Sequence, residues 1–156
     1  MRSFKSLLVS LIGLTALMYA LQNLANIGLF GQQPDAGSPA GSGTAPHTLF
    51  STSADASWMG FALITLCQLA IGAVALTGGW RLYAARGGTT EEFKEAKTTA
   101  VWAGALSLLS WFALALLVGG GLFHWGTETG VAALTRSFQL SSTSALTILF
   151  VWGTTD

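Results

Sequence analysis

The chain has 156 residues, of which 9% are charged and 51% hydrophobic, and its formal net charge is zero. Soluble domains carry about 25% charged residues, so this chain has too few charges to cover a soluble surface, and we expect it to lie in a lipid bilayer. A neutral chain also lacks the basic surface that nucleic-acid binding needs, which excludes nucleic acid as a partner. The single cysteine, Cys67, excludes a disulfide within the chain.

Four apolar runs alternate with three polar segments, which predicts an all-α fold: a four-helix transmembrane bundle forming one membrane domain over residues 1–156. A helix needs about 20 residues to cross the hydrocarbon core of a bilayer. The last run is the shortest, and it is rich in serine and threonine. We place the spans at about residues 6–27, 58–83, 98–122 and 137–153.

The first span has the parts of a secretory signal peptide, because Arg2 and Lys5 precede its apolar run. The sequence Ala20, Leu21, Gln22 that follows is a poor cleavage site. We therefore expect the segment to be retained as a transmembrane helix, with Arg2 and Lys5 on the cytoplasmic side.

Small and polar residues recur along the first span at spacings of three and four, which places them on one face of a helix. In lipid, small residues allow the backbones of two helices to approach closely. We take this small-residue face as a candidate for packing against a partner helix; it consists of Ser6, Ser10, Gly13, Ala16, Ala20 and Asn23.

The polar segments differ in their basic residues, which predicts the side on which each lies. Residues 28–57 are rich in proline, glycine and hydroxyl residues and contain no Lys or Arg, so we expect an outer loop there. Residues 84–97 are basic and predict a cytoplasmic loop, in which Thr90 is the expected N-cap of the next helix. A short outer connection is expected over residues 126–136.

The basic residues also predict the orientation of the bundle. Arg136 alone falls on the expected outer side. The positive-inside rule then favours an up-and-down bundle with both termini in the cytoplasm (N-in/C-in). The basic residues on the expected inner side are Arg2, Lys5, Arg81, Arg86, Lys94 and Lys97.

Aromatic and charged side chains near the ends of the spans are candidates for contact with lipid headgroups, because such side chains concentrate at the membrane interface. These candidates are Trp58, Trp80, Arg81, His124 and Arg136.

Short motifs at the ends of the spans, taken together in their order, resemble a bacterial family of predicted small integral membrane proteins, grouped as domain of unknown function 2165. The motifs are Gln22-Asn23-Leu24, Gly79-Trp80-Arg81-Leu82, Phe93 with Ala96-Lys97, Gly119-Gly120-Gly121-Leu122-Phe123, and Arg136. The resemblance implies four spans in a bacterial inner membrane and no established activity. It also implies a glutamate in the second span and another after the glycines of the third, where this chain has Gln68 and Gly121.

The sequence offers little for catalysis or cofactor binding. His47 and His124 cannot supply axial haem ligands from facing helices, and one cysteine does not suffice for an iron–sulfur cluster or a structural zinc site. The span interiors lack the Asp, Glu, Lys or Arg that ion translocation usually requires, and we expect Gln68 to hydrogen-bond a neighbouring helix. We therefore expect no enzyme activity, no metal and no cofactor.

The hypothesis that remains concerns the surface. We expect a non-catalytic accessory subunit of a larger bacterial inner-membrane complex, with a respiratory or photosynthetic complex as the first host class. Its partners would be other membrane-protein subunits and lipids, with a bound lipid or quinone nearby. One alternative is a small homo-oligomeric channel or exporter with Gln68, Ser107 or Ser110 lining its pore; another is an enzyme acting at headgroup level through His124 and Glu128.

Overall fold

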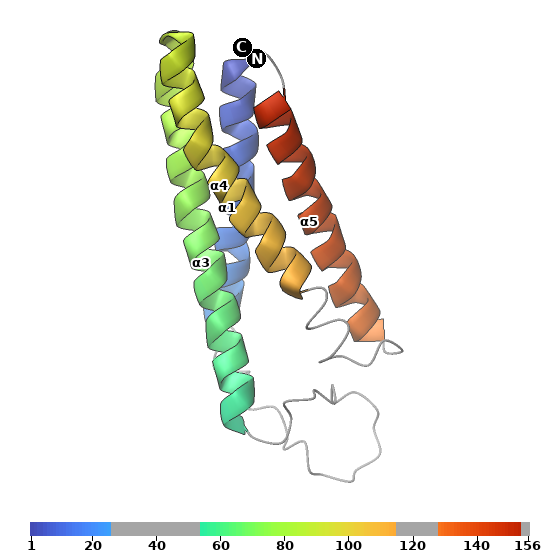
Figure 1. Cartoon of the computed structure of the whole chain (residues 1–156). Coiled ribbons are helices and arrows are strands. Elements are labelled where there is room, and N and C mark those ends of the chain that lie inside the picture. Colours follow the sequence, from blue (N-terminus) through green and yellow to red (C-terminus); the bar gives the residue numbers. More distant parts are fainter. Residues whose placement is uncertain (26–53, 115–127, 154–156) are drawn as a thin grey trace.

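The computed structural model describes residues 1–25, 54–114 and 128–153, with backbone alone at 54–61, 114, 128–130 and 132–133. Within these residues the chain is helical and has no strand, which confirms the all-α prediction for this part of the protein (Figure 1). The elements are α1 (Arg2–Ala25), α3 (Ala54–Ala84), the 3-10 turn η1 (Ala85–Gly87), α4 (Thr90–Leu114) and α5 (Glu128–Gly153).

Two stretches in the described part of the chain are long and apolar enough to cross a membrane: α1, and residues Ala62–Gly87 of α3 and η1. Large apolar side chains are exposed on all four helices, among them Leu11, Leu66 and Leu109. Water would disfavour so much exposed apolar surface, whereas acyl chains would solvate it.

The helices pack in chain order, α1 on α3, α3 on α4 and α4 on α5 (Figure 1). Helices α1 and α3 run in opposite directions, because Ser6 contacts Gly79 at one end and Asn23 contacts Gln68 at the other. Helices α1 and α5 meet near the two chain termini, and α5 leans away from α1 toward the opposite end (Figure 1).

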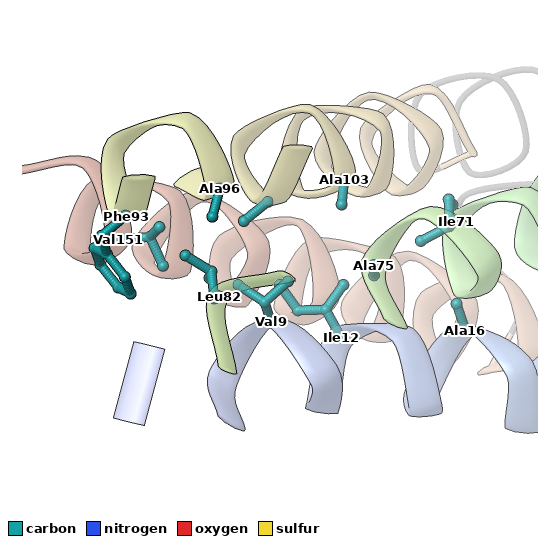
Figure 2. Close-up of a cluster of buried hydrophobic side chains, with 11 residues drawn as sticks. Val9, Ile12, Ala16, Ile71, Ala75, Leu82, Phe93, Ala96, Ala103 and Val151 are labelled. Atoms are coloured by element: carbon teal, nitrogen blue, oxygen red, sulfur yellow. The ribbon is translucent and has the colours of Figure 1, made fainter. Parts of the chain in front are cut away.

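The core consists of small residues and a few larger ones (Figure 2). Alanines of α1, α3 and α4 bring the three helices close together, while the larger side chains fill the end near the termini, where Leu82, Phe93 and Val151 are almost completely buried. The small members of this core are Ala16, Ala75, Ala96, Ala100 and Ala103.

Helix α4 begins with a capping box. The Thr89 backbone N–H donates to Glu92 Oε2 at 2.8 Å, and the Glu92 backbone N–H donates to Thr89 Oγ1 at 3.3 Å. This reciprocal pair satisfies backbone donors that would otherwise have no partner at the helix start. The N-cap is therefore Thr89 and not the predicted Thr90, and the connection before α4 is much shorter than the predicted loop over residues 84–97.

Helix α5 is longer than the predicted fourth span and includes most of the expected outer connection over residues 126–136. Four of its hydroxyl side chains donate to the carbonyl four residues earlier, which satisfies their polar atoms without water. A helix rich in serine and threonine is therefore compatible with lipid. The bonds run from Thr135 to Val131, Ser141 to Ser137, Thr143 to Gln139 and Thr147 to Thr143, at 2.8–2.9 Å.

The other helices can be compared with the predicted spans residue by residue. Helix α1 begins before the predicted span at 6–27 and ends at Ala25, and α3 begins at Ala54, inside the predicted outer loop 28–57. The rest of that loop lies outside the described residues. The third span, predicted at 98–122, is described as far as Leu114.

Candidate functional site

The small-residue face of α1 lies against α3. A Cβ atom added at Gly13 would come within 3.0 Å of the Leu76 backbone nitrogen and 3.1 Å of Ala75 Cβ. At the other end of the contact, a Cβ on Gly79 would meet Ser10 and lie 3.2 Å from the Ser6 carbonyl oxygen. The two backbones therefore touch over several turns, as small residues in lipid permit.

The structure places Ser6, Ser10, Gly13 and Asn23 of the predicted small-residue face against α3 of the same chain, and it buries Ala16 and Ala20. The partner helix is α3 of the same chain, because α3 carries a matching narrow face with Gly72, Ala75 and Gly79 at spacings of three and four. Ser6 Oγ also donates to the Gly79 carbonyl oxygen at 2.8 Å, a buried bond between the helices. This face of α1 is therefore covered by α3.

An amide cluster joins the C-terminal part of α1 to the middle of α3. Asn23 Nδ2 donates to Gln68 Oε1 at 2.9 Å and to Thr65 Oγ1 at 3.2 Å. Gln68 and Thr65 are buried. The expectation that Gln68 hydrogen-bonds a neighbouring helix is confirmed by its bond to Asn23 of α1.

A hydroxyl pair joins α4 to α5. The Oγ atoms of Ser107 and Ser144 lie 2.9 Å apart, and both residues are almost completely buried. Nearby, a Cβ on Gly104 would collide with the side chain of Ile148. Ser107 was a candidate for lining a pore, and the structure instead places it in a helix contact.

A cluster of cations surrounds Phe93 at the end of the bundle that holds the termini. The Phe93 ring is fully buried; its centroid lies 4.8 Å from Arg2 Cζ, 5.6 Å from Lys97 Nζ and 5.8 Å from Lys5 Nζ. Arg2 also donates to the Gly88 carbonyl oxygen at 2.8 Å. Sequence reasoning missed this cluster, although the phenylalanine among basic residues was a signal for it, since cations favour the face of an aromatic ring.

The candidates for the membrane interface lie as follows. Trp80 is exposed at the end of α3 with Tyr83 beside it, and Arg81 donates to Thr99 Oγ1 of α4 at 3.0 Å. The predictions for the Trp58 side chain and for His124 lie outside the described residues.

Arg136, the remaining candidate, lies at an open groove between α1 and α5. The groove has a volume of about 420 Å³. Apolar residues of α1 form most of its length, and Tyr19 is held there against Trp111, with ring centroids 5.2 Å apart. The groove residues are Leu11, Leu14, Thr15, Met18, Tyr19, Gln22 and Arg136.

No group of three or more His, Cys, Asp or Glu residues that could hold a metal occurs among the described residues. Every buried side-chain nitrogen and oxygen in the same part of the chain has a hydrogen-bond partner. Some of these bonds connect described helices, as at Ser6, Gln68 and Ser107, and others, as at Ser141 and Thr147, stay within one helix.

Comparison with known proteins gives one family. The search of curated proteins and the search of solved structures found no match. A family model described as "predicted small integral membrane protein (DUF2165)" matches residues 51–153, which comprise the described helices α3, α4 and α5. Helix α1, and with it the motif Gln22-Asn23-Leu24, precedes the matched residues. Because the match covers more than half of the 156 residues, this chain belongs to the DUF2165 family of predicted small integral membrane proteins.

Proposed function

We propose that this protein is a non-catalytic accessory subunit of a larger bacterial inner-membrane complex. In this proposal four helices cross the membrane as an up-and-down bundle, and both termini are cytoplasmic. The protein acts by packing against the helices of other subunits and against lipid.

One observation carries the proposal: hydrogen bonds made by buried polar side chains fasten pairs of the described helices. The bonds from Ser6 to Gly79 and from Asn23 to Gln68 join α1 to α3, and the Ser107–Ser144 pair joins α4 to α5. A transporter or enzyme needs polar groups that face a path or a substrate. Groups already bonded to a neighbouring helix are not available for that purpose.

The positions of the basic residues support the orientation. The start of α1, the turn η1 and the start of α4 meet at one end of the bundle, where Arg2 donates to the Gly88 carbonyl oxygen (Figure 1). The inner-side residues of the sequence prediction gather there, and Arg136 lies toward the other end. The positive-inside rule then favours the cytoplasm for the end that carries the N-terminus.

The surface that we assign to a partner subunit is the outer face of α1. Its small-residue face is occupied by α3, and the large side chains on the opposite side stay exposed. They recur at spacings of three and four, so a second helix can pack along them with its side chains between theirs. The outer face of α1 consists of Phe4, Leu7, Leu11, Leu14, Met18 and Leu21. Because Leu11, Leu14 and Met18 also border the groove toward α5, we assign the partner contact to Phe4, Leu7 and Leu21.

Photo-crosslinking in native membranes tests this assignment. A photoreactive amino acid replaces Leu7 or Leu21 on the outer face of α1 and, as a matched control, the equally exposed Leu66 of α3. We expect crosslinks to another membrane protein from positions 7 and 21 and none from position 66. Crosslinks to lipid alone at all three positions would refute the assignment. A product with the mass of two copies of this chain would favour the homo-oligomeric channel instead.

A further inference from the structure

The groove between α1 and α5 changes character along its length. From Leu11 to Met18 its wall is apolar, because the Thr15 hydroxyl in this stretch donates to the Leu11 carbonyl oxygen of its own helix at 2.8 Å. The groove is also lined by Gln22, near the C-terminal end of α1, and by Arg136 of α5. An apolar groove with a cation near one end matches a phospholipid, in which an apolar acyl chain is joined to an anionic phosphate.

The length of the groove agrees with the thickness of the hydrocarbon part of one leaflet. Leu11 and Gln22 are separated by 11 residues of α1, which at 1.5 Å per residue correspond to about 16 Å. Half of the hydrocarbon core measures about 15 Å. Gln22 lies one turn before the end of α1 at Ala25, so the polar end of the groove falls at headgroup depth when α1 spans the bilayer.

The positive charge of Arg136 at the polar end of the groove favours an anionic headgroup. The Arg136 side chain is exposed, and no hydrogen bond or ion pair within the described residues involves it. Arginine binds phosphate oxygens through two parallel N–H donors, and Gln22 adds a neutral donor beside it. By contrast, Arg81 near the other end already donates to Thr99.

The geometry points to a binding site for one anionic phospholipid of the outer leaflet, with an acyl chain along Leu11, Leu14 and Met18 and the phosphate at Arg136 and Gln22. The leaflet follows from the orientation proposed above, but binding itself requires no partner subunit. The site is therefore testable on the purified chain alone, and its failure would leave the crosslinking result unaffected.

Native mass spectrometry of the delipidated full-length protein in detergent tests the site. Phosphatidylglycerol, phosphatidylcholine, diacylglycerol and inorganic phosphate are titrated in separate arms. We expect phosphatidylglycerol to bind as a single preferred adduct. Arg136→Gln should weaken that adduct about tenfold, as the loss of a charge-assisted hydrogen bond does, and Arg136→Lys should weaken it less.

Two further variants separate charge from shape. Lys94→Gln removes the same charge from an exposed helix position, where Lys94 pairs with Glu91 at 2.9 Å, and should leave lipid binding unchanged. Met18→Trp narrows the groove without changing charge and should weaken the adduct. Equal binding of phosphatidylglycerol and diacylglycerol, or an equal loss in Lys94→Gln, would overturn the inference. Displacement of the lipid by inorganic phosphate at equal concentration would do the same, by showing a site for free anions.

Discussion

At the scale of single residues, stability depends on the absence of side chains where α1 and α3 touch. Gly79→Val introduces atoms against Ser10 and the Ser6 carbonyl, which are fixed by the adjacent backbone. We expect a loss of about 1–3 kcal/mol in unfolding free energy, the usual cost of overpacking. Unfolding by sodium dodecyl sulfate, followed by circular dichroism, measures it.

The matched control for that substitution is Gly87→Val, because a Cβ at Gly87 meets no atom within 4 Å. We expect the unfolding free energy of Gly87→Val to stay close to that of the unmodified protein. If both variants lose the same stability, the loss reflects the replacement of glycine in general, and the close contact of α1 with α3 is wrong.

The amide cluster offers a second test at this scale. A double-mutant cycle with Asn23→Leu and Gln68→Leu isolates the energy of the bond from Asn23 Nδ2 to Gln68 Oε1. Interhelical hydrogen bonds in membranes contribute about 0.6 kcal/mol on average and up to about 1.7 kcal/mol, so we expect a coupling energy in this range. Strictly additive losses in the same unfolding assay would show that the two side chains do not interact.

At the scale of elements, the start of α4 distinguishes two adjacent threonines. Thr89 makes the capping-box bonds, whereas Thr90 is the first residue of the helix. We expect Thr89→Ala to destabilise the protein by about 1 kcal/mol and to speed hydrogen exchange in the first turn of α4. Thr90→Ala should do neither. If Thr90→Ala destabilised the protein and Thr89→Ala did not, Thr90 would be the N-cap.

The sequence predicted the small-residue face of α1 but not its pairing with α3. The repeats around Gly13 and around Ala75 and Gly79 are both visible in the sequence, because small residues mark faces where backbones can approach. Any narrow face can pack on any other, so a partner's helix and a helix of the same chain were equally compatible with the pattern. The similar spacing of small residues in α1 and α3 was the feature of the sequence that could have indicated this pairing.

The helix ends were predicted less well than the helices, because polarity was taken as evidence for loops. Residues 128–136 contain charged residues and were assigned to an outer connection, yet they are helical in α5. Alanine and leucine at 132–134 favour a helix whether or not it lies in lipid. Hydropathy marks where lipid ends, and the helix continues beyond that point.

At the scale of the whole molecule, the orientation of the bundle in the membrane can be tested separately. Alkaline phosphatase is active outside the inner membrane, so a fusion after residue 40 should be active and fusions after residues 88 and 153 inactive. Green fluorescent protein at the same positions should give the opposite pattern. If the fusion after residue 153 were active and the fusion after residue 40 inactive, the bundle would have the opposite orientation. The Arg136 groove would then lie in the inner leaflet.

The central claim is that this protein acts by association with other membrane subunits. The most direct test extracts the tagged protein from its native membranes into polymer-bounded lipid discs, without detergent, and measures the mass and composition of the particles. We predict particles that contain defined additional membrane proteins in constant ratio. A monodisperse disc with a single copy of this chain and lipid alone would contradict the account.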